Sequence, residues 1–341
     1  MAQELGLSRT TVSDALRDHP RVKAKTRVEV QAYARSVGYR FNPLASSILS
    51  EVRRTRLSAF HGVLAVVSLD EPARPQFPGP YWHDLLAGAA DRADHLGFKL
   101  ERFLVGSPGV SVHRLDKILQ SRGIRGVMIM PAWGRPDFRH LDWSNYAGVY
   151  VDYLIDRPAL HSVCPDHPRA MVTALENLRR LGYRRPGLAL LEPDSARVQN
   201  RWAAAFLAEV TLVKGFELLP PLLMPQPDEA LFAKWFKRHK PDVVLGHRTE
   251  YVSWMERCGA RVPATHGFCC LNIHLNDAPA AGLDLQPFQI GVCGMDIVIS
   301  QLHRNEYGIP ALPHTTNVPA HWVDGPTLPP VPAAGVPAGQ A

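Results

Sequence analysis

The chain has 341 residues, of which 46% are hydrophobic and 21% are charged, an ordinary composition for a folded protein. It has no secretory signal and no uninterrupted apolar run approaching about twenty residues, so we expect a soluble, cytoplasmic protein that does not enter a membrane. Its five cysteines lack regular spacing, which indicates reduced thiols and no zinc site.

The net charge of +6 is concentrated at the N-terminus. Residues 1–56 contain 11 Lys and Arg against 5 Asp and Glu, whereas the rest of the chain contains 27 of each kind. Such asymmetry is typical of a protein whose one end neutralises phosphates. A solvated basic surface, the alternative, would not explain so sharp a boundary.

Residues 6–17 predict a helix-turn-helix. Gly6 ends a short first helix, and Ser8 can cap the next one by accepting hydrogen bonds from its first turn. Val12 and Leu16 share one face, which we expect to be buried, while hydroxyl and Arg side chains share the other. The polar face suits base edges and phosphates in the major groove. An ordinary amphipathic surface helix is the alternative.

A third helix and a short hinge follow. The third helix opens near Lys25, has an apolar side that includes Val30 and Ala34, and ends at Gly38. In residues 42–48, Asn precedes Pro as at the start of another helix. This segment is too short to be helical alone, so we expect it to order when two hinges meet on DNA.

The order of the motifs TTVSDAL, RVKAKTR and VGYRFNPLASSI resembles the headpiece and hinge of the lactose/galactose-repressor (LacI/GalR) family, over roughly residues 2–50. The resemblance implies a double-stranded DNA operator as partner. Carried over position by position, it assigns DNA binding to Ser8, Arg9, Thr10, Thr11, Ser13, Asp14, Arg17, Asn42, Ala45 and Ile48. Ile48 stands where the family usually inserts a Leu into the minor groove.

One departure concerns the start of the chain. The family's first helix usually begins several residues before the position of Met1, so we expect this helix to be truncated. Either translation starts upstream of Met1, which we favour, or the headpiece is loosened.

After the hinge, strands alternate with helices. An apolar run at 62–68 is typical of a strand buried on both faces of a parallel sheet, and a helix is expected at 82–96. Further strands are expected near 99–104, 126–130, 149–151, 188–191 and 243–245, and further helices near 112–122, 166–181, 198–210, 229–239, 250–258 and 288–307. This many units predict two doubly wound parallel sheets.

The body also resembles the family's effector domain, which is similar in fold to periplasmic sugar-binding proteins, through fragments such as Leu85-Leu86-Ala87-Gly88 and Trp322-Val323-Asp324-Gly325. The expected fold class is an all-α helix-turn-helix headpiece joined to a two-lobed, periplasmic-binding-protein-like α/β body. The expected domains are a headpiece (1–41), a hinge helix and linker (42–57), a two-lobed effector-binding and dimerisation domain (58–325) and a disordered tail (326–341).

In this family a small molecule, often a sugar or nucleobase, lies between the lobes near strand ends. The resemblance assigns effector binding to Tyr81, Trp82, Asp166, Trp202, His247 and Asn272. Trp202 takes the place of a frequent ligand-binding Arg, so we expect charged contacts to be replaced. Several alternatives stay open: Trp202 can be a packed core residue, Asp166 a helix cap and His247 a surface histidine, while His167 is interpreted as a loop residue.

The leading hypothesis is a homodimeric, sequence-specific transcriptional regulator, with repression as the expected mode, controlled by a small-molecule effector for which a sugar is one candidate. The alternative is a small-molecule (sugar) binding protein with a non-functional headpiece. An enzyme is disfavoured because the sequence contains no P-loop, HExxH, GxSxG or metal-ligand spacing. We therefore expect no catalytic residues, metal or cofactor.

Overall fold

In a computed structural model the chain divides into two units, residues 1–59 and residues 60–341, which we call the headpiece and the body. The structure describes residues 2, 4–16, 20–36, 60–71, 79–106, 109–134, 136–152 and 157–329. Within this part of the chain, no helix combines the length and the apolar character needed to cross a membrane.

The headpiece contains helices α1 (Arg9–Leu16) and α2 (Ala24–Ser36). The predicted cap is confirmed, because the backbone N–H of Thr11 donates to the Ser8 hydroxyl at 3.0 Å. Among the described residues that precede this cap, residues 4–6 form a turn in place of the predicted short first helix, and the Leu7 N–H donates to the Ala2 carbonyl. The predicted helix-turn-helix is therefore not confirmed.

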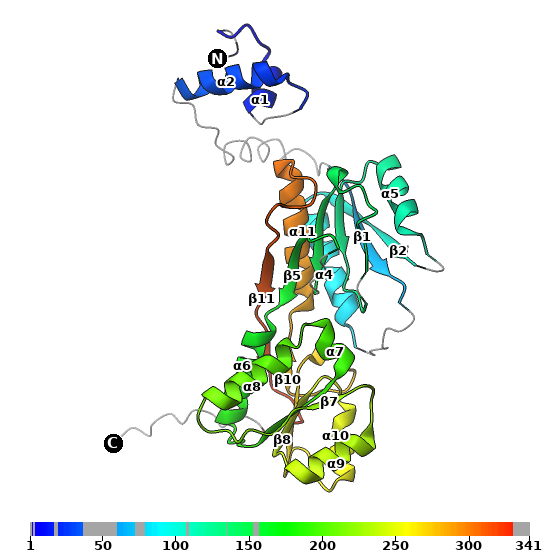
Figure 1. Ribbon diagram of the computed structural model, residues 1–341, viewed down its shortest axis with the longest axis vertical. Coiled ribbons are helices and arrows are strands. Elements are labelled where there is room, and N and C mark those ends of the chain that lie inside the picture. The colour runs from blue at the N-terminus through cyan, green and yellow to red at the C-terminus, as the bar shows by residue number, and fades with distance from the viewer. Residues whose placement is uncertain are drawn as a thin grey trace, which may run out of the picture. The chain divides into compact units, whose positions relative to one another are not determined.

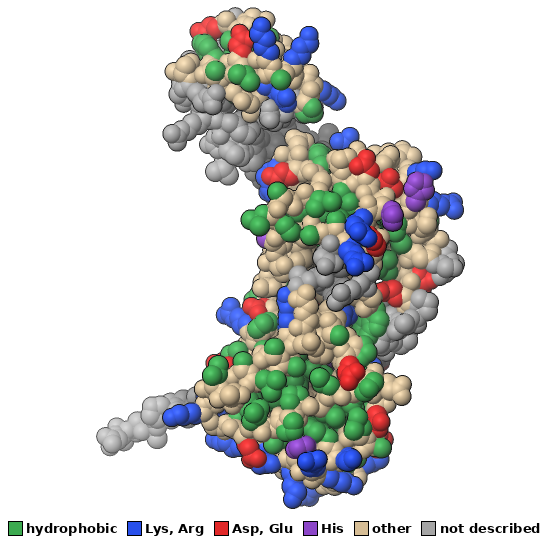
Figure 2. All heavy atoms as spheres, viewed as in Figure 1, with side chains coloured by type: hydrophobic (Ala, Val, Ile, Leu, Met, Phe, Trp, Pro, Cys, Tyr) green, Lys and Arg blue, Asp and Glu red, His purple; other side chains and the backbone are tan. Residues whose placement is uncertain are grey.

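A small apolar cluster joins the two headpiece helices. Val12 and Ala15 of α1 are buried together with Val22 and Val30. The Gln31 side chain also donates a hydrogen bond to the Ala15 carbonyl near the end of α1. Val12 is therefore buried as predicted, whereas Leu16 is only half-buried against the same cluster. Figure 2 shows Lys and Arg side chains on the headpiece surface.

The body has two lobes. The first, the N-lobe, is a six-stranded parallel sheet in the order β11-β5-β4-β3-β1-β2. Its strands are β1 (Gly62–Leu69), β2 (Phe98–Val105), β3 (Gly126–Ile129), β4 (Ala147–Val151), β5 (His161–Pro165) and β11 (Thr315–Val318), and its helices are α4 (Tyr81–His95), α5 (Val112–Ser121), the 3₁₀ turn η1 (Trp143–Asn145) and α11 (Pro287–Arg304).

Helices cover both faces of this sheet. Val66 of β1 lies in one cluster with Leu85 of α4 and Val298 of α11, whereas the next residue, Val67, lies in another cluster with Leu115 of α5. Figure 1 shows α4 and α11 side by side against the sheet. Neighbouring strand residues point to opposite faces, so a strand covered on both sides must be apolar throughout.

The second lobe, the C-lobe, has strand order β12-β10-β9-β8-β6-β7, parallel except for the antiparallel pair of β10 and β12. Its strands are β6 (Pro186–Leu191), β7 (Leu222–Met224), β8 (Val243–Gly246), β9 (Gly267–Cys270), β10 (Gly282–Asp284) and β12 (His321–Val323), and its helices are α6 (His167–Arg180), α7 (Glu192–Arg197), α8 (Arg201–Leu212), α9 (Glu229–His239), α10 (Glu250–Arg257) and the 3₁₀ turn η2 (Ile273–Leu275). Helices again cover both faces, since Leu190 packs with Phe206 of α8 and Leu191 with Phe232 of α9. The predicted pair of doubly wound sheets is confirmed.

Three segments connect the lobes: β5 runs into α6, β10 into α11, and β11 into β12. The first and third of these segments are joined by a hydrogen bond: the Asp166 N–H, between β5 and α6, donates to the carbonyl of Val318, at the end of β11, at 2.8 Å. The folded chain also extends beyond the predicted boundary at Gly325. Thr327 and Leu328 are buried, and the Thr327 hydroxyl donates to the Phe268 carbonyl, which anchors these residues against the C-lobe.

Two glycines allow α4 and α11 to approach closely. A Cβ at Gly88 would lie 2.0 Å from the Phe288 carbonyl oxygen, and one at Gly291 would lie 2.0 Å from the Leu85 carbonyl oxygen. We therefore expect Gly88→Ala to push the helices apart and lower the free energy of unfolding by about 1–3 kcal/mol, measured by urea denaturation. Ala90→Ser, at an exposed position of α4, is the control and should change it by less than about 0.5 kcal/mol. Unaltered stability of Gly88→Ala would contradict this packing.

Candidate functional site

A cavity lies between the two lobes, at the carboxyl ends of strands from both sheets. It is lined by Tyr81, Trp82, Trp133, Asp152, His167, Asp194, Arg197, Val198, Trp202, His247, Asn272, Leu275 and Leu285. These residues come from the loops and helices that follow strands of the two sheets. In the N-lobe, β1 connects to β2 on one side and β3 connects to β4 on the other, so the chain runs in opposite directions along the sheet from this point. Open parallel sheets bind ligands at such switch points.

The N-lobe wall is built from the start of α4 and from two loops. Tyr81 and Trp82 are the first residues of α4. The Glu71 carboxylate accepts hydrogen bonds at 2.7–2.8 Å from the backbone N–H groups of Trp133 and Gly134, which fixes the loop that carries Trp133. Asp152 follows β4 directly and has a left-handed backbone with φ of 56°.

Arg197 of α7 reaches across the cavity to the N-lobe. Its Nη2 atom lies 3.6 Å from the Asp152 Oδ2 atom, Nη1 donates to the Ala132 carbonyl at 3.4 Å, and the guanidinium lies over the Trp133 ring at 5.6 Å. Burial raises the pKa of the Asp152 carboxyl, and the Arg197 charge opposes this shift. The side chains of Arg197 and Asp152 are only 16% and 3% exposed, so the pair is shielded from solvent.

Two histidines flank a buried indole on the C-lobe side. The Trp202 ring meets His167 edge-on at 5.0 Å between centroids and His247 at 5.7 Å. Burial, together with nearby arginines, lowers the pKa of both histidines to about 3. Both rings are therefore neutral at pH 7 and each offers one donor and one acceptor nitrogen.

Three buried polar atoms of the cavity-lining residues have no hydrogen-bond partner among the described residues: His167 Nδ1, Asp194 Oδ1 and His247 Nδ1. Burial and the nearby Asp152 carboxylate hold the pKa of Tyr81 well above its ordinary value, so its hydroxyl stays protonated. Burial also raises the pKa of Asp194, against the charges of Arg248 and Arg197. A buried polar group without a hydrogen bond costs folding free energy, so a cluster of such groups beside one cavity indicates a site for a polar ligand.

The structure brings together five of the six residues assigned to effector binding: Tyr81, Trp82, Trp202, His247 and Asn272. Asp166 does not line the cavity; its side chain accepts from the Arg169 N–H at 3.2 Å and caps α6, which is the alternative left open from the sequence. Trp202 is 1% exposed and belongs to the hydrophobic core while its edge lines the cavity. Asn272 accepts from the His274 N–H and shapes η2.

One sequence interpretation is wrong. His167 is not a loop residue but the buried first residue of α6. The replacement of charged contacts at Trp202 and Asn272 stays a prediction, and the cavity has in addition three charged residues that the sequence interpretation did not name, Asp152, Asp194 and Arg197. Asp152 was detectable as the polar residue that ends a buried strand, whereas Arg197 lies on α7, a short helix that the periodicity did not reveal.

The residues assigned to DNA binding are placed only in part. Ser8 caps α1, and Thr11 and Asp14 are partly exposed on it. The side chains of Arg9, Thr10 and Ser13, and residues Arg17, Asn42, Ala45 and Ile48, lie outside the described part of the structure. In the described ranges, no group of three or more His, Cys, Asp and Glu side chains is arranged to hold a metal ion.

The fold is that of LacI-family transcriptional regulators. It matches the CelR–cellobiose complex with a TM-score of 0.59 and 17% identity, over 96% of this chain and 98% of that one. It matches the lac repressor dimer bound to operator and the anti-inducer ONPF with a TM-score of 0.55 and 17% identity, over 96% of this chain and 97% of that one. It also matches a LacI-family regulator from Rhizobium etli with a TM-score of 0.61 and 18% identity, over 78% of this chain and 98% of that one.

Among curated proteins, the chain is 28% identical over 200 residues to the HTH-type transcriptional regulator IpsA of Corynebacterium glutamicum, covering 58% of this chain and 52% of that protein. It is 35% identical over 202 residues to an HTH-type transcriptional regulator of Mycobacterium tuberculosis, covering 59% and 54%. The chain thus matches about half the length of these relatives. No family model matches it.

Proposed function

We propose that this chain is a cytoplasmic, sequence-specific DNA-binding regulator, a repressor acting as a homodimer, whose DNA affinity is controlled by a small molecule bound between the lobes. The observation that carries the proposal is the interlobe cavity, where buried polar atoms without partners meet three tryptophans in a fold shared with CelR and the lac repressor. Those neighbours are described as complexes with cellobiose and with operator DNA, respectively.

The headpiece supports the DNA-binding half of the proposal. Its helix α1 buries an apolar face and keeps its N-terminal cap, and the whole excess of positive charge lies in residues 1–56. A protein that contacts several phosphates loses affinity steeply as salt rises. The test is binding of the full chain to random-sequence duplex DNA over a series of salt concentrations. A steep decrease is expected, and absence of binding even at low salt would favour a small-molecule binding protein with a non-functional headpiece.

Asp14 is unusual on a DNA-reading helix because its carboxylate repels phosphate and accepts only from a donor such as the cytosine amino group. With duplexes selected from a random pool, Asp14→Ala is expected to relax discrimination at one base pair by about 1–3 kcal/mol. Glu29→Ala makes the same charge change at an exposed position of α2, so it should alter affinity uniformly. Identical base preferences for Asp14→Ala and the parent would make Asp14 a bystander.

The cavity favours a neutral, hydroxyl-rich ligand. Arg197 and Arg248 offset the charges of Asp152 and Asp194, while the histidines are neutral. Hydroxyl groups can both donate and accept, which suits the mixture of a carboxylate oxygen, a phenol and imidazole nitrogens, and indole rings pack on the apolar faces of sugars.

Thermal unfolding in the presence of neutral mono- and disaccharides, cellobiose included, tests whether the cavity binds a neutral, hydroxyl-rich ligand. A true ligand at a hundred times its Kd adds about 2.7 kcal/mol of stability. Asp194→Asn should reduce that gain because it weakens an acceptor without changing shape. Stabilisation by sugar phosphates alone would contradict a neutral ligand.

A further inference from the structure

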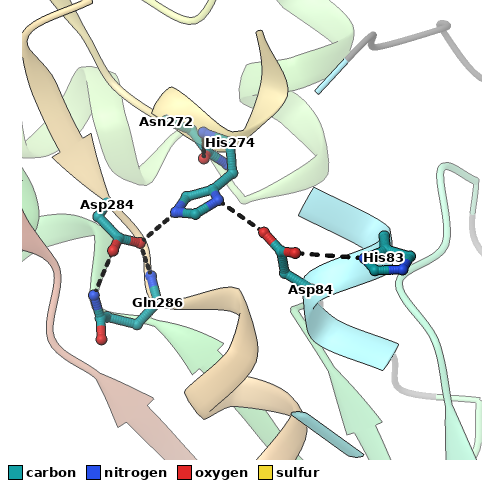
Figure 3. A network of polar contacts seen from close by, with 6 residues as sticks. All are labelled: His83, Asp84, Asn272, His274, Asp284 and Gln286. Carbon is teal, nitrogen blue, oxygen red and sulfur yellow. Dashed lines mark hydrogen bonds and ion pairs between the residues drawn. The ribbon is translucent and has the colours of Figure 1, made fainter. Parts of the chain in front are cut away.

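One histidine connects the two lobes beside the cavity (Figure 3). His274, on η2 of the C-lobe, places Nδ1 at 3.0 Å from the Asp84 Oδ2 atom of α4 in the N-lobe. Its other nitrogen, Nε2, lies 2.8 Å from Oδ1 of Asp284, at the end of β10. The ring is therefore held between carboxylates that belong to different lobes.

This geometry requires a charged ring. A neutral imidazole has a single N–H, so one of its nitrogens would direct a lone pair at a carboxylate oxygen, whereas the imidazolium donates from both nitrogens. The contact with Asp284, more than that with Asp84, raises the pKa of His274 above its usual value, although burial opposes the shift. The bridge is thus complete only when His274 carries its second proton.

The other charged and polar groups around the bridge belong to three elements. His83 of α4 lies 3.6 Å from Asp84 but is 83% exposed and shares its helix, so it does not link the lobes. The Gln286 backbone N–H and side-chain amide each donate to Asp284 at 2.7 Å. Burial raises the pKa of Asp284, but the hydrogen bonds from His274 and Gln286 and the charges of His274 and of His321 on β12 outweigh burial and hold that pKa below its ordinary value. Asp284 therefore remains ionised through the range in which His274 titrates.

The segments that form the bridge also form the cavity. Asp84 follows Tyr81 and Trp82 on α4, and His274 lies between Asn272 and Leu275. At the same contact the Gly79 N–H donates across the lobes to the Leu275 carbonyl at 3.3 Å. A Cβ on Gly79 would lie 2.3 Å from the His274 carbonyl oxygen, so the two backbones touch.

We propose that His274 is a positioning residue that holds the lobes together over the cavity while it is doubly protonated and releases them when it loses a proton. The inference rests on the proposed function only in that the cavity is the ligand site. Because the bridged pKa is raised, the stabilisation is fully present below the unbridged value of about 6.5 and is lost as pH rises through the bridged pKa.

The test uses the ligand-free full chain and two readouts. NMR titration gives the imidazole pKa of His274, assigned by the signal missing in His274→Gln. Site-resolved amide exchange of Gly79, corrected for the intrinsic rate, reports lobe separation. Between the unbridged and bridged pKa values, the opening equilibrium should rise with pH, with a limiting slope of about tenfold per pH unit. Asp84→Asn, which keeps the shape of the side chain, should lower the bridged pKa of His274. The interval of pH over which the opening equilibrium changes should therefore become narrower.

His83→Gln is the matched control: it removes the neighbour of Asp84 that lies on the same helix and should leave the pH dependence intact. In His274→Gln the pH dependence should vanish. A His274 pKa at or below about 6.5, or the same pH dependence in His274→Gln as in the parent, would overturn the proposal. Neither readout involves DNA or a ligand, so failure here is distinct from failure of the proposed function.

Discussion

Trp202→Ala is expected to lower the free energy of unfolding by about 3–5 kcal/mol, because truncating a buried aromatic side chain leaves a void that its neighbours fill only in part. Trp202 is 1% exposed, packs in the core with Phe206 of its own helix and separates the rings of His167 and His247. Its removal would also open the wall of the cavity.

Urea denaturation followed by circular dichroism gives this value. Trp202→Phe should lose less, since an aromatic ring remains. Trp322→Ala is the control for loss of an indole, because Trp322 is only partly buried and its N–H bonds to the exposed side chain of Asp324. A loss below about 1 kcal/mol for Trp202→Ala would be incompatible with a core residue.

Arg197→Met is expected to cost about 3 kcal/mol at pH 7, since removing one partner of a buried pair leaves the other charge uncompensated. The remaining Asp152 carboxyl, 3% exposed, would then have a still higher pKa. A carboxyl with a raised folded-state pKa does not destabilise the fold below its unfolded pKa of about 3.9. Its destabilising effect grows as pH rises toward the folded-state pKa, so the deficit should shrink as pH is lowered toward about 4.

The control is Arg92→Met. Arg92 Nε lies only 2.6 Å from Asp296 Oδ1, but the two side chains are 33% and 43% exposed, so this closer pair should contribute less than about 1 kcal/mol. Unfolding free energies at pH 7 and near pH 4 provide the comparison. Equal losses for the two variants, or a deficit for Arg197→Met that does not change with pH, would show that burial of the Asp152 pair is not the dominant effect.

Long elements with a strong hydrophobic period are predictable from the sequence. Helix α9 has the predicted bounds Glu229–His239, and β1 extends only one residue beyond the predicted strand. The strands β5, β7, β9, β10 and β11 are missed because they have only three to five residues, and three of them, β5, β9 and β10, include Cys, Pro or Gly. The predicted helix at 198–210 corresponds to α8, which begins three residues later, after the left-handed residues Gln199 and Asn200, whereas the short helix α7 before it is missed.

The site is predictable to the same degree. The family resemblance assigns Tyr81 and His247 to one effector site, and both line the same cavity. This agrees with the rule that ligands bind at the strand ends of open parallel sheets. Pairings across the lobes are not predictable: Asp152 meets Arg197, and Asp84 meets His274, only because three chain crossings bring the lobes face to face. Nothing in the spacing of these residues encodes such contacts.

Selection of duplexes from a random pool with the full chain shows whether this protein reads a DNA sequence. Affinity for the enriched duplex is then compared with affinity for a scrambled duplex at about 0.15 M salt. We expect a single enriched motif that binds at least about a thousandfold more tightly than the scrambled duplex. Equal affinity for the two duplexes, or no enriched motif after repeated rounds, would contradict sequence-specific binding.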